Sequence, residues 1–169
     1  EYGFKERFSN KTAIAPTASI SIICGGASPG VEPIAANSYT HKTLSGSYNV
    51  KNRYLKKILK KYGKDDDQIW SSITTNQGSV EHLKFLTEHE KAVFKTAFEL
   101  DQKWIVELGA DRTTHVSQAQ SINIFLPADV HKKELHQIHF QAWKKGLKSL
   151  YYCRSKSIQR AENVNNGLS

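Results

Sequence analysis

A strand, a helix and a second strand follow one another toward the carboxyl end of the sequence, and this order limits the fold more than any other feature. Ser121 to Leu126 alternates along its length with a period of two, as strands do. Asp129 can cap a helix from Val130 to Lys145, which Gly146 ends. Leu147 to Cys153 is then a second short strand. Because strands joined by a crossover helix pair in parallel, the sequence predicts an α/β fold.

The segments near the amino end predict loops, strands and a basic helix. The small and β-branched residues from Thr12 to Cys24 predict a loop that enters a buried strand, and Gly25 to Gly30 predicts a turn. This turn has neither the dinucleotide-binding fingerprint nor the lysine of a phosphate loop. Asn37 to Tyr48 is aromatic and rich in threonine, so we expect it to be extended. A helix from about Asn49 to Tyr62 follows it.

Helices are also expected in the middle of the chain. Lys64 to Thr75 begins with aspartates, which favour the first turn of a helix. Ser79 to Leu86 is predicted as a short helix. Thr87 and Glu90 have the spacing of a capping box, so another helix begins there. A further helix is predicted from about Asp101.

The chain is strongly basic, with a net charge of +8 and a pI near 9.4. Clustered lysines can bind nucleic acid, so a basic nucleic-acid-binding module is one possible function. The densest basic run is Lys51 to Lys64. Its apolar residues recur at spacings of three and four, which is typical of a helix that lies on a core with its lysines in solvent: Tyr54, Leu55, Ile58, Leu59 and Tyr62. This pattern favours the core-lying helix over a nucleic-acid groove.

Cysteine, histidine and hydropathy patterns predict a cytoplasmic protein without a metal site. Cys24 and Cys153 are far apart and outside any C-x-x-C pattern, which indicates neither a disulfide framework nor a zinc site. His136 and His139 lack the neighbouring glutamate of the common metal motifs, so no metal ligands are predicted. No apolar run is long enough to span a bilayer, and the first residues lack a signal-peptide pattern, so no membrane partner is expected.

Two short segments carry side chains that could perform chemistry. Pro16 to Ser21 combines hydroxyl groups with small residues, so its donors could converge on an anion. Tyr151 and Tyr152 are adjacent near the end of a predicted strand. On the residues alone, ordinary alternatives are stronger for both: a buried turn for the first segment, and one core and one surface tyrosine for the second.

Several segments in a fixed order change this balance, because together they resemble the large subunit of class I ribonucleotide reductases. The resemblance covers nearly the whole chain, from about Tyr2 to Ala161. The matching runs are A-P-T-A-S-I-S at 15–21, G-V-E-P at 30–33, N-S-Y-T-H-K-T-L-S-G at 37–46, Q-A-Q-S-I-N-I-F at 118–125, W-K-K-G-L-K-S-L-Y-Y at 143–152 and R-S-K-S-I-Q-R-A at 154–161.

The resemblance implies a fold and a division of the chain. The family fold is an α/β barrel of parallel strands with helices outside, and this chain would supply its carboxy-terminal part, with helices packed around a few strands. Residues 1–153 would belong to the barrel domain. Residues 154–169 are polar and show no pattern, so the sequence itself predicts a mobile tail there.

The resemblance also implies roles for the two candidate segments. The family segment that matches 16–21 binds the phosphates of the nucleoside diphosphate substrate. Here the hydroxyl groups would come from Thr17, Ser19 and Ser21, with backbone groups from Ala18 and Ile20. The pair matching Tyr151 and Tyr152 carries a radical from the small subunit to the active-site cysteine. Phenols suit this role because each can lose an electron and a proton together, and adjacency keeps each step short.

The resemblance finally implies that this chain acts in a complex. The family's thiyl-radical cysteine and reducing cysteines belong to segments that have no counterpart here, and neither Cys24 nor Cys153 falls at a catalytic position. Reduction of ribonucleoside diphosphates would therefore need an amino-terminal fragment of the large subunit and a radical-generating small subunit. That small subunit would carry the dinuclear metal centre and the radical, and this chain would bind no cofactor. An inactive remnant of a reductase is the remaining alternative.

Overall fold

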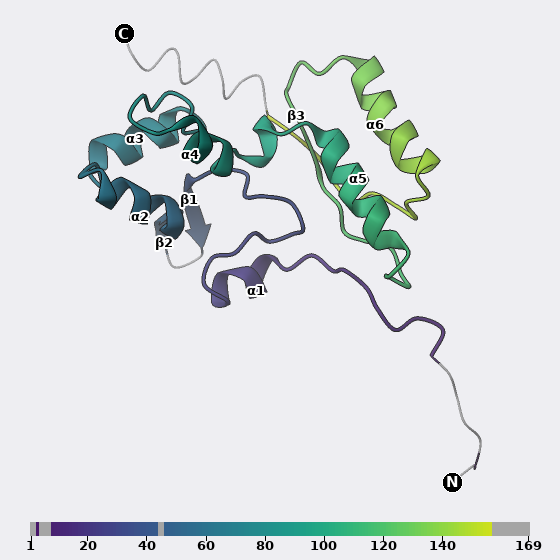
Figure 1. The fold of residues 1–169 in the computed structure, drawn as a ribbon. Coiled ribbons are helices and arrows are strands. Elements are labelled where there is room, and N and C mark those ends of the chain that lie inside the picture. Colours follow the sequence, from purple (N-terminus) through teal and green to yellow (C-terminus); the bar gives the residue numbers. More distant parts are fainter. Residues whose placement is uncertain (1–2, 4–7, 44–45, 157–169) are drawn as a thin grey trace.

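The computed structural model describes residues 3, 8–43 and 46–156, which form two apolar cores covered by helices, with short strands beside them (Figure 1). The elements in chain order are α1 (Ala18–Ile23), β1 (Ser38–Thr43), β2 (Gly46–Lys51), α2 (Arg53–Lys61), α3 (Asp67–Thr75), α4 (Glu88–Val93), the 3-10 helix η1 (Ala97–Glu99), α5 (Gln102–Thr113), β3 (Ile124–Leu126), α6 (Lys132–Lys144) and β4 (Cys153–Ser155).

The predicted parallel unit is confirmed. β3 and β4 pair in parallel, with Ile124 opposite Cys153. Helices α5 and α6 pack together on this unit, and their shared core is fully apolar: Ile105, Val106, Ile122, Ile124, Leu126, Ile138 and Ala142. This arrangement confirms the α/β class, although the described residues form two two-stranded sheets and do not close a barrel.

The boundaries of this unit differ from those predicted. α6 begins at Lys132 rather than at Val130, because the ring nitrogen Nδ1 of His131 accepts a hydrogen bond from the backbone N–H of Lys133 and caps the helix in place of Asp129. β4 begins only at Cys153 and includes Arg154 and Ser155, which were predicted to lie in the tail. Lys156 follows β4, and residues 157–169 of the predicted tail lie outside the described residues.

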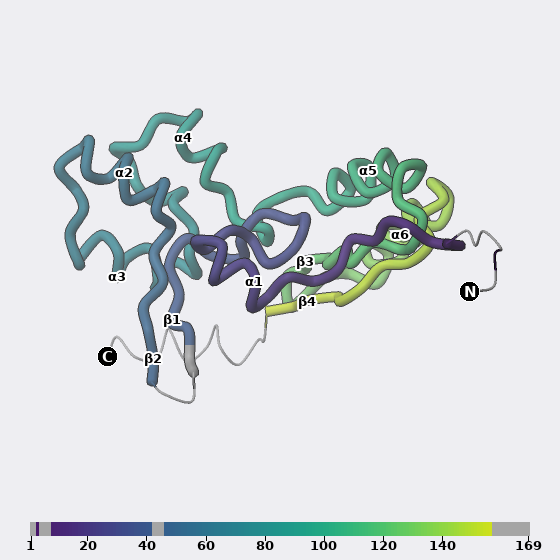
Figure 2. Tube along the Cα trace, turned by 90° about the horizontal axis from the view of Figure 1, so that it is seen from below, coloured from purple at the N-terminus to yellow at the C-terminus, as the bar shows by residue number. Residues whose placement is uncertain are grey.

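One edge of residues 121–125, the stretch that leads into β3, is covered by three different acceptors. The backbone N–H of Ser121 donates to the carbonyl of Ile14 at 2.9 Å, next to a parallel bridge between Ile14 and Gln120. Two residues further, the N–H of Asn123 donates to the carboxyl of Glu32, and the N–H of Phe125 donates to the side-chain carbonyl of Gln102. Figure 2 shows the amino-terminal segment passing beside this part of the chain, where Ile14 bridges to Gln120.

The prediction that Thr12 to Cys24 forms a loop entering a buried strand is wrong for its second half. Ile14 does bridge to Gln120, but the residues after Pro16 turn into the helix α1. The chain reverses there because Thr17 donates to the carbonyl of Pro29 through both its N–H (3.0 Å) and its Oγ1 (3.1 Å). The isoleucines that suggested a buried strand are not covered by the described residues: Ile20, Ile22 and Ile23 are more than half exposed.

The segment predicted to be extended forms a hairpin. β1 and β2 pair antiparallel, with Ser38 opposite Lys51, so the extended structure is confirmed and reaches further than predicted. The basic helix begins only at Arg53, because Asn49 to Lys51 belong to β2. Asn52 caps this helix, since its side-chain oxygen accepts from the N–H groups of Tyr54 and Leu55.

Helices α2, α3 and α4 surround the second core. The predicted position of α2 is confirmed, since Leu55 and Leu59 are fully buried in this core. Asp66 caps α3, and the capping box of Thr87 and Glu90 at the start of α4 is confirmed in both directions. The other members of this core are Trp70, Ile73, Val80, Leu83 and Leu86.

The predicted helix from Ser79 to Leu86 is wrong. The chain there makes successive single turns, with the N–H of Leu83 bonded to the carbonyl of Val80 and the N–H of Leu86 bonded to that of Leu83. Val80, Leu83 and Leu86 are three residues apart and are all buried by these turns. An α-helix would bury residues at the same spacing, so the sequence pattern alone suggested a helix.

Candidate functional site

The two tyrosines lie directly before β4 and are held by the backbone at the start of β3 and just before it. The N–H of Tyr151 donates to the carbonyl of Ile122 at 2.8 Å, and the carbonyl of Tyr152 accepts from the N–H of Ile124 at 2.9 Å. Their rings nevertheless lie against each other, with centroids 4.2 Å apart and an interplanar angle of 54°. The structure therefore brings both phenols together, instead of pointing one into the core and one to the surface.

Both tyrosines are accessible to solvent, and the environment of Tyr151 shifts its pKa. Tyr151 is 46% exposed and Tyr152 is 53% exposed. Interaction with the neighbouring phenol of Tyr152 raises the pKa of Tyr151, while the nearby charge of Arg154 acts in the opposite direction. The guanidinium carbon of Arg154 lies 5.3 Å from the centre of the Tyr152 ring. Tyr151 is therefore a neutral phenol at physiological pH.

The predicted phosphate-binding residues form the first turns of α1. The N–H groups of Ala18, Ser19 and Ile20 lie in the first turn of this helix, where no intrahelical acceptor exists, and no other described residue accepts from them. They point out of the amino end of the helix and are free to bind an acceptor. The neighbouring N–H of Ser21 is already bonded to the carbonyl of Thr17 at 2.8 Å.

The three predicted hydroxyl groups are not equivalent. Ser21 is buried, and its Oγ donates to the carbonyl of Ala18 at 2.9 Å. The hydroxyl of Thr17 donates to the carbonyl of Pro29. The hydroxyl of Ser19 is exposed and has no partner among the described residues. Of the three, Ser19 alone presents an unengaged O–H donor beside the free N–H groups.

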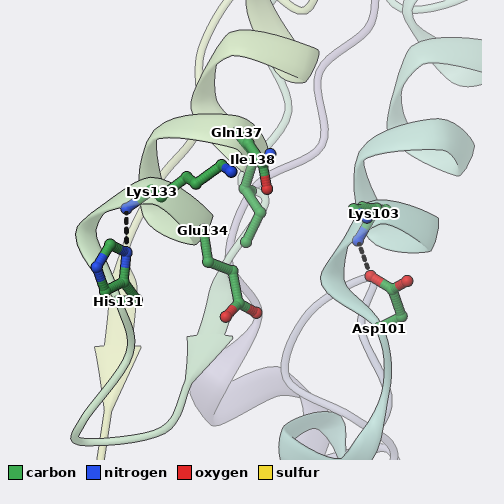
Figure 3. Close-up of a pocket in the computed structure, with 7 residues that line it drawn as sticks. All are labelled: Asp101, Lys103, His131, Lys133, Glu134, Gln137 and Ile138. Carbon is green, nitrogen blue, oxygen red and sulfur yellow. Dashed lines mark hydrogen bonds between the residues drawn. The ribbon is translucent and has the colours of Figure 1, made fainter.

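A polar hollow of about 500 Å³ lies between the amino ends of α5 and α6, apart from both candidate segments (Figure 3). The polar groups in it mainly cap these helices: the Oδ1 of Asp101 accepts from the N–H of Lys103 at 2.9 Å, and His131 accepts from Lys133 at 3.1 Å. The residues that line it are Asp101, Lys103, His131, Lys133, Glu134, Gln137 and Ile138. None of the predicted site residues is among them.

The other candidates from the sequence do not form a site. Cys24 and Cys153 are both exposed free thiols. In the described part of the chain, no three His, Cys, Asp or Glu side chains gather closely enough to hold a metal ion. None of the helices in the described ranges is long and apolar enough to cross a membrane.

One residue beside the candidate segments was given no role from the sequence. Glu32 is buried and accepts hydrogen bonds from Asn123 of the strand stretch that holds the tyrosines. It lies within the G-V-E-P run, and an acidic residue between a glycine and a proline was the available signal. Its burial could not be foreseen, because carboxylates are seldom found inside proteins.

Comparison with known proteins gives a consistent result. The family described as ribonucleotide reductase, barrel domain, matches residues 1–153. The ribonucleoside-diphosphate reductase large subunit of Invertebrate iridescent virus 6 is 51% identical over 166 residues, which cover 96% of this chain and 17% of the relative. Large chain 2 of the same enzyme from Saccharomyces cerevisiae is 37% identical over 156 residues, or 92% of this chain and 18% of the relative.

A solved structure agrees with these relatives. The alpha subunit of the class Id ribonucleotide reductase of Actinobacillus ureae superposes with a TM-score of 0.77 at 42% identity, covering 85% of this chain and 26% of that subunit. The chain thus spans between about a sixth and a quarter of the length of these relatives. Since the family match covers most of its length, the chain belongs to the barrel-domain family of ribonucleotide reductases.

Proposed function

We propose that this chain supplies two parts of the large, catalytic subunit of a ribonucleoside-diphosphate reductase: the segment that binds the substrate phosphates and the tyrosine pair of the radical-transfer path. The observation that carries the proposal is the geometry of Tyr151 and Tyr152. Two phenol rings with centroids 4.2 Å apart are poorly explained by core packing, because each side chain remains about half exposed.

The tyrosine pair has the properties that a radical relay needs. Oxidation of a phenol at neutral pH releases a proton as well as an electron, so the proton must have an acceptor. We propose the phenol of the adjacent tyrosine, whose ring lies in contact, as the acceptor of that proton. The ring contact gives the electron a short path. Each phenol can then be oxidised by one neighbour and reduced by the next without leaving a charged intermediate.

The amino end of α1 supports phosphate binding. Free N–H groups at the start of a helix attract anions, because they are hydrogen-bond donors at the positive end of the peptide dipoles. Ala18, Ser19 and Ile20 offer three such groups, and the hydroxyl of Ser19 adds a fourth donor. Thr17 and Ser21 would have a structural role instead, because their hydroxyl groups donate to the backbone carbonyls of Pro29 and Ala18 and hold the turn in place.

The partners follow from the same proposal. The amino-terminal part of the large subunit would provide the remaining barrel and the active-site cysteines, and a small subunit with a dinuclear metal centre would generate the radical. The exposed isoleucines of α1 support a covering segment, since Ile20, Ile22 and Ile23 are more than half exposed beside the proposed phosphate site. A cytoplasmic location, where nucleoside diphosphates are made, belongs to this proposal as well.

A reconstitution assay tests the proposed function. This chain is mixed with the amino-terminal part of a large subunit, such as that of the iridescent virus relative, and with a radical-generating small subunit, and each component is omitted in turn. Formation of deoxyribonucleoside diphosphates that requires all three supports the proposal. Assembly of all three on a sizing column without any product would contradict a catalytic role for this chain.

A further inference from the structure

Glu32 is the one acidic side chain buried among the described residues, with 4% of its surface exposed. A buried carboxyl group must have both oxygens satisfied, because burial removes its contact with water. None of the cationic side chains in the described ranges forms an ion pair with it. One residue satisfies both oxygens instead: the backbone N–H of Asn123 donates to Oε1, and the Nδ2 of the same residue donates to Oε2 at 3.3 Å.

The segment around Glu32 is folded to fit this carboxyl group. The hydroxyl of Ser28 donates to the backbone carbonyl of Glu32, which closes the turn. Gly30 lies directly under the carboxyl: a Cβ there would overlap Oε2 and would lie 3.5 Å from the Nδ2 of Asn123. A side chain at position 30 would therefore displace the carboxyl of Glu32.

Glu32 joins the two segments of the proposed site. On one side, Pro29, three residues earlier, holds Thr17 at the start of α1 through two hydrogen bonds. On the other side, Asn123 lies between Ile122 and Ile124, the residues whose backbones hold Tyr151 and Tyr152. The contact between Glu32 and Asn123 is thus a direct link between the turn that supports α1 and the strand that supports the tyrosines.

The orientation of the Asn123 side-chain amide is set by the carboxyl group of Glu32. Its Oδ1 is buried and has no hydrogen-bond partner among the described residues. An amide turned by 180° would place Oδ1 against the carboxyl oxygen of Glu32, where two acceptors would repel each other. Glu32 therefore fixes the orientation of Asn123 at the expense of one unsatisfied acceptor.

We infer that Glu32 is a positioning residue that holds the phosphate-binding segment in a fixed place relative to the tyrosine pair, through its two hydrogen bonds to Asn123. This inference rests on the proposed function for the identity of the two segments. Loss of the contact should loosen both segments at once, although Glu32 itself touches neither a phosphate nor a phenol.

An exchange of the two side-chain types tests the contact itself. Asn123→Asp places two carboxyl groups face to face, whereas Glu32→Gln combined with Asn123→Asp restores an amide and a carboxyl in reversed order. The Gln side chain would accept from the N–H of residue 123 and donate to the new carboxyl. We expect the single variant to lose the contact and the double variant to regain it.

Hydrogen exchange on the full chain provides the first measurement. In Asn123→Asp, the amides of Thr17, Tyr151 and Ile124 should exchange about threefold to tenfold faster, as expected for the loss of about one hydrogen bond. In the double variant their rates should return toward those of the wild type. Glu81→Ala removes an exposed carboxyl group and should change none of them. Equal rates in the single and double variants would overturn the inference.

Kinetics in the reconstituted reductase provide the second measurement. Asn123→Asp should raise KM for the nucleoside diphosphate and lower kcat, and the double variant should recover both. A merely structural role would reduce the amount of folded enzyme and leave both constants unchanged per folded molecule, which would overturn the positioning role alone. A wild-type complex that forms no product would instead overturn the proposed function, and the exchange rates would then decide whether Glu32 couples the two segments.

Discussion

Tyr62 at the end of α2 donates its phenol hydrogen to Glu90 of α4, with 3.0 Å between the hydroxyl and Oε2. The same carboxylate accepts from the N–H of Thr87 at 2.9 Å, so one side chain both completes the capping box of α4 and attaches α4 to α2. The backbone hydrogen bond from Thr87 is the main cause that lowers the pKa of Glu90, and the hydroxyl groups of Thr87 and Tyr62 add to it.

Glu90 should make stability depend on pH in the acid range. Because the folded-state pKa of Glu90 is lowered, its contribution is fully present above the ordinary pKa of about 4.3 and is lost as the pH falls through the folded value. Glu90→Gln should therefore lower the melting temperature near pH 7 and have a smaller effect at acid pH. Glu88→Gln, at an exposed position of the same helix, is the matched control. Melting curves with a difference that does not change with pH would refute this account.

Tyr151→Phe and Tyr152→Phe should each abolish nucleotide reduction while leaving assembly intact. Each change removes the oxidisable O–H group and keeps the ring contact. Product formation and co-elution of the assembled complex are measured on the same samples. Tyr48→Phe on the exposed face of β2 should have no effect. Normal turnover by either phenylalanine variant would rule out the radical relay.

Ser19→Ala and Ser21→Ala should differ, although both remove a hydroxyl group from α1. Ser19 offers a free donor to a charged ligand, and such a bond is worth about 1.5–3 kcal/mol, so its loss should raise KM for the diphosphate by about tenfold or more. Ser21→Ala removes an internal bond to Ala18 and should destabilise α1 by about 1 kcal/mol. Substrate titrations and hydrogen exchange of α1 separate the two effects. Unchanged affinity in Ser19→Ala would count against the phosphate site.

Gly78→Ala should destabilise the chain more than Gly63→Ala. Both glycines have positive φ angles, +83° and +65°, so each substitution carries the cost of a left-handed backbone, about 1–2 kcal/mol. A Cβ at Gly78 would also overlap Ala36 and come within 2.9 Å of the N of Asn37, whereas a Cβ at Gly63 meets nothing within 4 Å. Urea unfolding measures the difference, and equal losses for the two variants would show that the overlap relaxes freely.

Local patterns in the sequence were sufficient for elements whose signals lie within a few residues. The capping box of Thr87 and Glu90, the core-facing leucines of α2 and the parallel pair of β3 and β4 all follow from spacing and connection length. These features depend on neighbours along the chain, or on the handedness of a crossover, and both can be read from the order of residues.

Features that depend on distant partners could not be predicted. The isoleucines of α1 suggested a buried strand because β-branched residues usually pack inside, but Thr17 is bonded to Pro29 and turns the chain into a helix there. The engaged hydroxyl of Ser21 and the buried carboxyl of Glu32 are likewise set by contacts that no local spacing encodes.

The same limit applies to the tyrosine pair. Strand alternation would have separated the rings of Tyr151 and Tyr152, but both residues lie before β4 begins, and their rings lie against each other. Only the family resemblance gave this pair a common role in advance.

The covered edge of residues 121–125 also bears on self-association. A row of open N–H groups along a strand is a template for pairing with a second chain, and proteins protect such edges to avoid aggregation. Along residues 121–125, which lead into β3, the carbonyl of Ile14, the carboxyl of Glu32 and the side-chain carbonyl of Gln102 accept from the N–H of every second residue. No foreign strand can dock there without displacing all three. Loss of the carboxyl at position 32 would therefore leave the N–H of Asn123 open in the middle of this edge. A variant that loosens the two segments would then also be more prone to aggregate.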